Sequence, residues 1–227
     1  MTKRIHILLA SAVYLVASSM VVQAASFSFS GELSQDDTVE YIYFTVGENL
    51  ITTSDTSTSV VIRTYSYGGG IQPDGTVVPA GGFDPILTLY DAAENFIGET
   101  DDDTTGLAQA DPSTRATYDA GDTFDLAPGT YTAAVSQWSN YAYLASTLSD
   151  EFVETGDGFF TGEFGCSNGQ FCDWTGANRS SLWAFGIENV ESAWIIAPVP
   201  LPASALLLLG GGLFLLPLGW IRVSKHA

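Results

Sequence analysis

Hydrophobic residues in the middle of the chain occur in short runs rather than in helical stripes. Between residues 25 and 198 the runs are rich in Val, Ile, Thr, Tyr and Phe, and Gly, Asp, Asn, Ser and Pro separate them. No segment of this part has the three- to four-residue repeat of an amphipathic helix. Short runs with frequent turn residues are typical of an all-β protein. The pattern predicts strands at residues 27–33, 39–46, 59–65, 86–90, 130–136 and 182–187.

The segment VEYIYFTV, residues 39–46, is apolar on both sides of the predicted strand. Side chains alternate between the two faces of a strand, so one face carries Val39 and Tyr41 while the other carries Ile42 and Phe44. A strand with two apolar faces is covered on both sides. We therefore predict a mainly β fold for the body of the chain, an antiparallel, jelly-roll-like β-sandwich.

The first 24 residues have the order of a signal peptide. Two basic residues precede the apolar run 5–22, and the small-residue stretch VQAA follows it. A basic start, an apolar stretch and a small-residue cleavage site are the three parts of a secretory signal. We predict a signal peptide at residues 1–24, cleaved after Ala24 or Ala25. The alternative is a membrane anchor that is never removed.

The other end of the chain contains a second apolar segment. Residues 203–221 carry no charge. A helix of this length rises about 28 Å, which is close to the thickness of the hydrocarbon layer. The basic tail, residues 222–227, follows directly, and positive flanks stay on the cytoplasmic side. We predict a transmembrane helix at 203–221 that leaves the body, residues 25–198, on the outer side of the inner membrane.

A short motif, VPLPA, directly precedes this helix and consists of Val199, Pro200, Leu201, Pro202 and Ala203. The motif, the apolar helix and the basic tail together, residues 199–227, resemble the PEP-CTERM sorting signal in its VPLPA variant. The resemblance implies export by a Gram-negative bacterium and processing by an exosortase, a membrane cysteine protease. It also implies a periplasm-facing precursor that then reaches the cell surface or extracellular exopolysaccharide. The tail holds two basic residues where an Arg-rich cluster is more usual.

Three segments of the body resemble a second family. GELSQDDTVEYIYFTV, FDPILTLYDAAENFIGETDDD and FDLAPGTYTAAVSQ look like successive parts of the bacterial pre-peptidase C-terminal type of domain, a secreted β-sandwich. The closing segment, residues 148–198, resembles the closing part of PEP-CTERM proteins built on this domain. The Gly- and Pro-rich residues 67–82 depart from the family pattern as an insertion. We predict that this insertion is a mobile loop.

Acidic residues outnumber basic ones by 26 to 7, which gives a formal charge of -19. The chain is 46% hydrophobic and 12% aromatic, which excludes an acidic disordered protein. The charge excludes a nucleic-acid partner bound through its phosphates. It also excludes binding to anionic lipid through a polybasic segment. Between the terminal segments the sequence has only the cations Arg63, Arg115 and Arg179, and no histidine. A histidine base, a histidine metal ligand and a Schiff-base lysine are therefore excluded from the body.

The two cysteines, Cys166 and Cys172, are separated by five residues. In a chain sent to an oxidising compartment, such a pair predicts a disulfide that closes a small loop. A zinc site and a redox-active pair are weaker alternatives, because zinc needs further ligands and redox pairs are usually closer in sequence.

Six acidic residues near the predicted strand 86–90 are candidate Ca²⁺ ligands: Asp84, Asp91, Glu99, Asp101, Asp102 and Asp103. Ca²⁺ takes several oxygen ligands and accepts irregular geometry. The three consecutive aspartates repel one another, and the body has few cations to neutralise them. Calcium is the one cofactor that the sequence suggests, although the EF-hand spacing is absent. The alternative is a solvated acidic turn without an ion.

Four tryptophans of the body could stack on sugar rings or belong to the core: Trp138, Trp174, Trp183 and Trp194. A glycosidase needs only two carboxylates, but 26 acids make some pair inevitable. We expect a non-enzymatic cell-surface or extracellular-matrix protein with a structural or adhesive role in exopolysaccharide. The alternatives are a carbohydrate-binding module that uses exposed tryptophans and a hydrolase that uses paired carboxylates.

Overall fold

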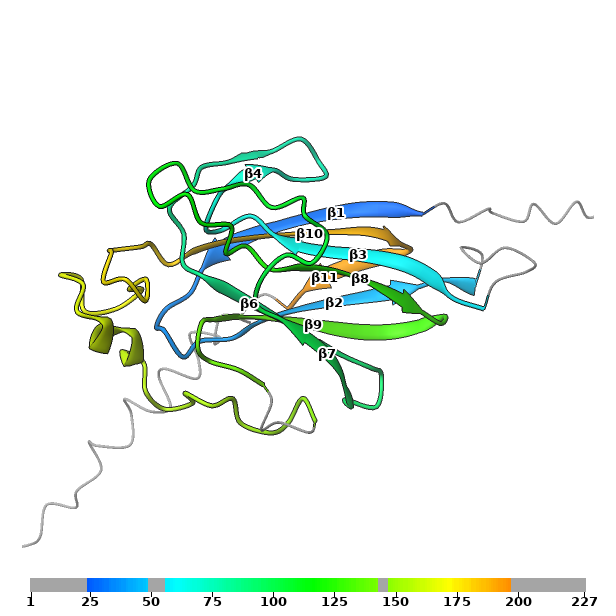
Figure 1. Ribbon diagram of the computed structural model, residues 1–227. Helices are drawn as coiled ribbons and strands as arrows, with labels where there is room; N and C mark the ends of the chain where they lie inside the picture. The colour runs from blue at the N-terminus through cyan, green and yellow to red at the C-terminus, as the bar shows by residue number, and fades with distance from the viewer. Residues whose placement is uncertain (1–23, 49–55, 143–146, 197–227) are drawn as a thin grey trace, which may run out of the picture. The chain divides into compact units, whose positions relative to one another are not determined.

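Two antiparallel sheets form the framework of the protein (Figure 1). The computed structural model describes residues 24–48, 56–142 and 147–196. One sheet has the order β1-β10-β3-β8, formed by Ala25–Glu32, Leu182–Val190, Thr58–Thr64 and Gly121–Leu126. The other has the order β11-β2-β9-β6-β7, formed by Ser192–Ile195, Glu40–Val46, Gly129–Gln137, Pro85–Tyr90 and Phe96–Thr100. The prediction of a mainly β, antiparallel fold is confirmed.

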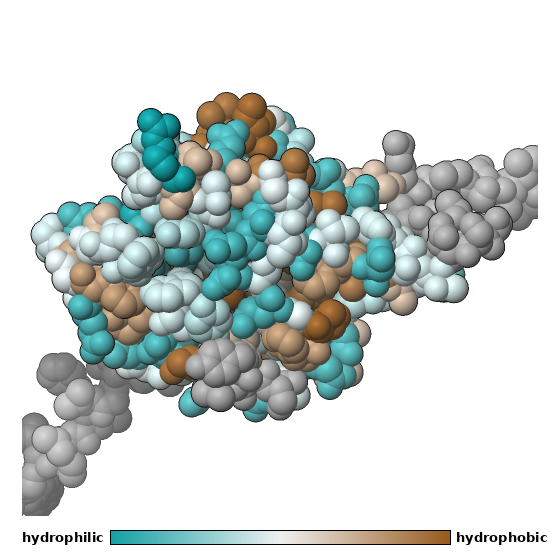
Figure 2. Space-filling model, viewed as in Figure 1, coloured by the Kyte–Doolittle hydropathy of each residue, from teal (hydrophilic) through white to brown (hydrophobic). Residues whose placement is uncertain are grey.

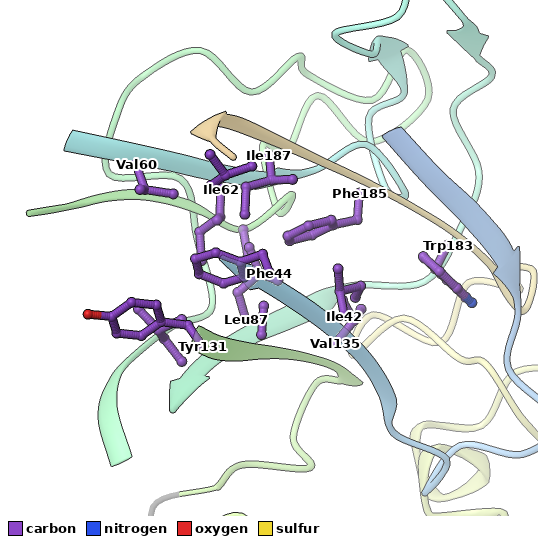
Figure 3. Close-up of a cluster of buried hydrophobic side chains, with 14 of the residues drawn as sticks. Ile42, Phe44, Val60, Ile62, Leu87, Tyr131, Val135, Trp183, Phe185 and Ile187 are labelled. Atoms are coloured by element: carbon purple, nitrogen blue, oxygen red, sulfur yellow. The ribbon is translucent and has the colours of Figure 1, made fainter. Parts of the chain in front are cut away.

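The main hydrophobic core lies between the two sheets (Figure 3). Phe44 and Leu87 enter it from the five-stranded sheet, and Ile62 and Phe185 enter it from the four-stranded sheet. All four side chains are buried because each lies at an inward position of its strand. The β-branched and aromatic residues that predicted strands thus also supply the contact between the sheets.

The outer face of the five-stranded sheet has a smaller core of its own. Tyr90 and Ala134 project from β6 and β9, and Phe152 packs over them from the segment after β9. Tyr41 of β2 lies at the margin of this cluster and is half-buried. The strand predicted to be apolar on both faces is therefore covered on both faces.

Residues 67–82, predicted to be a mobile loop, contain a paired hairpin instead. Its strands are β4, Gly70–Ile71, and β5, Val77–Val78. Between them the buried side chain of Gln72 donates from Nε2 to the carbonyl oxygens of Phe29 and Phe185, at 2.9 and 3.0 Å. These long-range hydrogen bonds attach the insertion to β1 and β10, so it contains paired structure, while its mobility stays a prediction.

The closing part of the body runs from β9 to β10 and includes the 3₁₀ helix Phe160–Phe164. Among the described residues, no helix is long and apolar enough to cross a membrane. The predicted sorting motif 199–203, transmembrane helix 203–221 and basic tail 222–227 lie outside the described residues. So does the predicted signal peptide up to residue 23, while Ala25 is the first residue of β1.

Candidate functional site

A pocket lies at the end of the five-stranded sheet where β6 begins and where β7 and β9 end. Antiparallel pairing places the start of β6 beside the ends of both neighbours. The residues just beyond these strand ends, with two connecting segments, enclose a cavity of about 260 Å³. We call it the acidic aromatic pocket, and its lining consists of three carboxylates and three aromatic side chains: Asp84, Asp101, Asp102, Tyr118, Trp138 and Trp174.

Asp84 is the most enclosed carboxylate of this pocket. It directly precedes β6, and its backbone carbonyl accepts a 2.8 Å hydrogen bond from the Trp138 amide. Only 8% of the residue is exposed, and no hydrogen bond within the described residues reaches its carboxylate. Burial, together with the nearby charges of Asp102 and Asp101, raises the pKa of the Asp84 carboxyl to about 9. At neutral pH this carboxyl therefore holds a proton.

The other two carboxylates follow the end of β7 and are more accessible. Asp101 is half-buried and accepts a 2.8 Å hydrogen bond from the Tyr141 hydroxyl. Asp102 is exposed, and the Thr100 hydroxyl donates to its backbone carbonyl at 2.5 Å. Partial burial of its carboxyl and the charge of Asp101 raise the pKa of Asp102. The pocket thus presents carboxylates from its buried floor to its open edge.

Each aromatic side chain of the pocket is positioned by a contact with another aromatic residue. Trp138 follows β9, and its ring packs against Phe164 of the 3₁₀ helix with 5.6 Å between centroids. Trp174 comes from the closing segment and donates from Nε1 to the Tyr118 hydroxyl at 3.2 Å. Tyr118 packs edge-on against Tyr67, with 5.0 Å between centroids. The ring faces are therefore available in fixed positions although they come from separate segments.

Tyr67 links the pocket to a buried ion pair. Its hydroxyl donates to Asp173 Oδ2 at 2.5 Å, and the Arg179 guanidinium lies 3.7 Å from its ring centroid. Burial and the hydrogen bond to Asp173 raise the pKa of the Tyr67 hydroxyl. Arg179 also pairs with Asp111 at 3.1 Å and donates to the carbonyl of Gly82 at 2.8 Å. Three chain segments behind the pocket are therefore joined around one arginine.

Three of the six predicted Ca²⁺ ligands serve the fold instead. Asp91 accepts backbone amides of the turn that follows it, including that of Asn95 at 2.9 Å. Asp103 likewise accepts amides of its own turn. Glu99 Oε2 accepts the Thr88 hydroxyl at 3.0 Å and the Ala142 amide at 2.7 Å. These carboxylates have protein partners, so we assign them no ligand.

The predicted Ca²⁺ site, for which the sequence left a solvated acidic turn as the alternative, stays a prediction. The six acids do not converge on one site. Asp91 in the β6–β7 turn and Glu99 in β7 instead accept hydrogen bonds from the protein. Within the described ranges, no group of three or more acids, histidines or cysteines is placed to hold a metal ion. The members that do come together line the acidic aromatic pocket: Asp84, Asp101 and Asp102.

The predicted disulfide pair lies just before the pocket residues of the closing segment. The sulfurs of Cys166 and Cys172 are 2.01 Å apart, which is bonding distance. Cys172 precedes Asp173 and Trp174 directly, so the bridge closes the loop that leads to one wall of the pocket.

The four candidate tryptophans have different surroundings. Trp138 and Trp174 line the same pocket, and Trp174 is 55% exposed. Trp183 is only 4% exposed and belongs to the core. Trp194 is 41% exposed and stacks on Tyr43 with 6.0 Å between centroids, outside the pocket.

A second cavity, of about 290 Å³, lies between the β4–β5 hairpin and the four-stranded sheet. Its lining includes Val77, Val78 and Trp183, and its acid, Glu32, is exposed. Exposed hydrophobic side chains gather over the hairpin (Figure 2), where Ile71 and Val77 face solvent. This cavity is slightly larger but has no buried carboxylate, so we place the candidate site in the acidic aromatic pocket.

Several residues that build the pocket were not predicted from the sequence. Tyr118, Tyr141 and Phe164 act through contacts between distant segments, and no local pattern marks them. The sequence does single out Arg179 in one respect, since it is one of three arginines in a body with 26 acids. A scarce cation in such a chain is a reasonable candidate for a buried ion pair.

The fold and the pocket define a mainly β protein with an acidic, aromatic recess at one end of a sheet. No protein-family model matches the chain, and no curated protein matches it significantly. Its function is therefore argued from the pocket itself.

Proposed function

We propose that this is an exported bacterial surface or extracellular-matrix protein that holds polysaccharide through the acidic aromatic pocket, without catalysis. The strand order supports a jelly-roll body. We letter eight strands B to I in chain order: β1, β2, β3, β6, β7, β8, β9 and β10. The four-stranded sheet then has the order B-I-D-G. The five-stranded sheet has the order C-H-E-F, with β11 added beside C. Two-sheet jelly rolls are common among lectin domains.

One observation carries the proposal: Trp138 and Trp174 share a pocket with a buried carboxylate. An aromatic face packs against the C–H groups of a sugar ring, and a carboxyl group exchanges hydrogen bonds with its hydroxyls. Drug-sized ligands need pockets of roughly 300 to 1,000 Å³. The cavity of about 260 Å³ therefore suits one sugar unit of a longer polymer.

The route to the surface is part of the same proposal. The signal peptide at 1–24 directs export, and the segment 199–227 retains the precursor in the inner membrane until an exosortase-type protease processes it. The bonded cysteine pair supports an oxidising compartment. Mass spectrometry of the mature chain tests this route, and an intact C-terminal segment in a strain with the protease would contradict it.

Two tryptophan variants test polysaccharide binding. The purified full-length protein is passed over immobilised polysaccharides as wild type, as Trp174→Ala and as Trp194→Ala. Both tryptophans are exposed, but only Trp174 lines the pocket. We expect Trp174→Ala to weaken retention about tenfold or more, a loss of about 1.4 kcal/mol, and Trp194→Ala to bind as wild type. Failure of the wild type to bind any polysaccharide, or equal binding by both variants, would overturn the proposal.

A hydrolase is the second candidate, and one observation favours it. Asp84 is protonated at neutral pH beside two more accessible carboxylates, which is the environment of a general acid in glycoside hydrolysis. Reducing-sugar release from the polysaccharide that binds separates the two functions. Turnover by the wild type that is lost in Asp84→Asn would establish the hydrolase, whereas binding without turnover would establish the adhesive protein.

A further inference from the structure

We infer that the sugar bound by the acidic aromatic pocket is positively charged, an amino sugar with a free ammonium group. This inference rests on the proposed polysaccharide-binding function and narrows it to one class of ligand. Three features of the pocket carry it: an unpartnered buried carboxylate, aromatic faces, and the absence of a cation from its lining.

Asp84 differs from the other buried aspartates of the described residues. The fold supplies side-chain hydrogen-bond donors to each of them: Asp36, Asp111, Asp119 and Asp173. Asp119, for example, accepts the amides of Tyr67 and Gly68 at 3.0 and 2.7 Å. The Asp84 carboxyl has no such donor, although it too is buried, with 8% of the residue exposed. In the free protein it holds a proton, because a buried carboxylate without donors is costly. A ligand ammonium would offer three donors together with the charge that lets the carboxyl ionise.

Within the described ranges, the protein supplies no side-chain cation to the pocket. No lysine or arginine is among the lining residues. Arg179 is held by Asp111 and by the Tyr67 ring, and Arg63 lies over the Tyr65 ring at 5.7 Å. Arg115 is exposed on a turn. Within the described residues, no side-chain cation balances Asp101, Asp102 or an ionised Asp84, and a cationic ligand would supply that charge.

The aromatic side chains favour the same ligand. Trp138, Trp174 and Tyr118 line the pocket, and the negative faces of such rings attract ammonium groups. The overall charge of -19 acts against uronic acid or sulfated polymers, because like charges repel as the polymer approaches. A neutral sugar avoids this repulsion but leaves Asp84 without a charged partner. A cationic sugar is not repelled by the acidic protein and gives Asp84 a charged partner.

Matched oligosaccharides test the inference. Binding of the full-length protein is measured by calorimetry at neutral pH with glucosamine oligomers and with N-acetylglucosamine oligomers of the same length and linkage. The two probes differ only in the charge and the acetylation of the amine. We expect the glucosamine oligomer to bind about tenfold or more tightly, because a charged hydrogen bond is stronger than a neutral one. Asp84→Asn should abolish this preference, and Glu151→Gln, which removes one exposed charge elsewhere, should preserve it.

The outcomes separate this inference from the function on which it rests. Equal binding of both oligomers, lost in Trp174→Ala but unchanged in Asp84→Asn, would overturn the inference and leave polysaccharide binding intact. Failure of every oligomer and polymer to bind would overturn both. A third arm uses CaCl₂ alone. An Asp84-dependent rise in melting temperature with calcium, without a preference for glucosamine, would replace the ammonium with a metal ion and overturn the inference.

Discussion

At the scale of single residues, Asp84 occupies a position that lowers the stability of the folded protein but suits the binding of a ligand. The carboxyl is buried before β6 without a hydrogen-bond donor, although other buried aspartates of the same fold have donors. Unpaired groups of this kind destabilise a folded protein and are concentrated at binding and catalytic sites. A buried acid without a donor at the wall of a pocket is therefore informative about ligand chemistry.

The pKa of Asp84 leads to a prediction about pH and stability. In the folded protein this pKa is raised to about 9, whereas the pKa of an aspartate in the unfolded chain is 3.8. Folding therefore takes up a proton between these values, and the contribution of Asp84 to stability is complete below about pH 4 and is lost as pH rises through about 9. The loss approaches about 1.4 kcal/mol per pH unit within this window.

Asp84→Asn removes this dependence while keeping the shape of the side chain. Urea unfolding of wild type and variant should show that the variant gains relative stability from pH 5 to pH 9. The Glu151→Gln control, which alters an exposed acid, should keep a nearly constant difference from wild type over the same range. A difference between wild type and Asp84→Asn that is independent of pH would show that Asp84 is ionised in the folded protein.

At the scale of elements, local pattern was sufficient where strands carry continuous β-branched or aromatic residues. This is why the predicted strands 59–65, 86–90 and 130–136 agree closely with β3, β6 and β9. β8 was missed because its sequence GDTFDL includes two acids, and its pairing with β3 decides its conformation. The hairpin at 67–82 was missed because distant carbonyl groups fix it through Gln72. Only long-range contacts specify such elements.

The candidate site was likewise predictable only in part, because long-range contacts define it. Sequence analysis named Asp84, Asp101, Asp102, Trp138 and Trp174 among larger sets, because acids near strand ends and tryptophans are chemically distinctive. It did not separate them from acids and tryptophans that serve the fold. That separation depends on burial and on the partners of each side chain, which are properties of the folded chain.

The closing segment gives a prediction at this scale. Replacing both cysteines, Cys166→Ser with Cys172→Ser, opens a loop with a sequence separation of 6. The lost restraint on the unfolded chain should lower the free energy of unfolding by about 2 kcal/mol. Ligand binding should weaken as well, since Trp174 lies just after the bridge. Denaturation and binding of the double variant test this, with the wild type under reducing conditions as the parallel case. Unchanged stability and binding would show that the other contacts of the segment suffice.

At the scale of the whole molecule, the acidic charge opposes compactness. The formal charge is -19, and the described residues contain one ion pair between side chains, Arg179 with Asp111. Repulsion among the remaining acids extends over about 30 Å at 0.01 M salt and over about 3 Å at 1 M. Added salt should therefore stabilise the protein.

Melting curves at rising NaCl concentration test this effect. We expect the melting temperature to increase by about 2 to 4 °C for each 1 kcal/mol of repulsion that is screened. CaCl₂ at the same ionic strength should give the same increase, because the six predicted ligands do not converge on one site. A clearly larger increase with millimolar calcium would instead indicate specific binding.

The pairing of β1 with β10 has a consequence for the order of events during the proposed export. Ala25 pairs with Val190, the register then shifts by one residue, and pairing continues from Ser26 with Glu188 to Glu32 with Leu182 (Figure 1). The four-stranded sheet thus joins the start of the body to its end, so it cannot close until nearly all of the body is present. Contacts over such sequence distances form late and slowly. A chain threaded through a membrane from its N-terminus would stay open during passage and complete its sheet only on the far side.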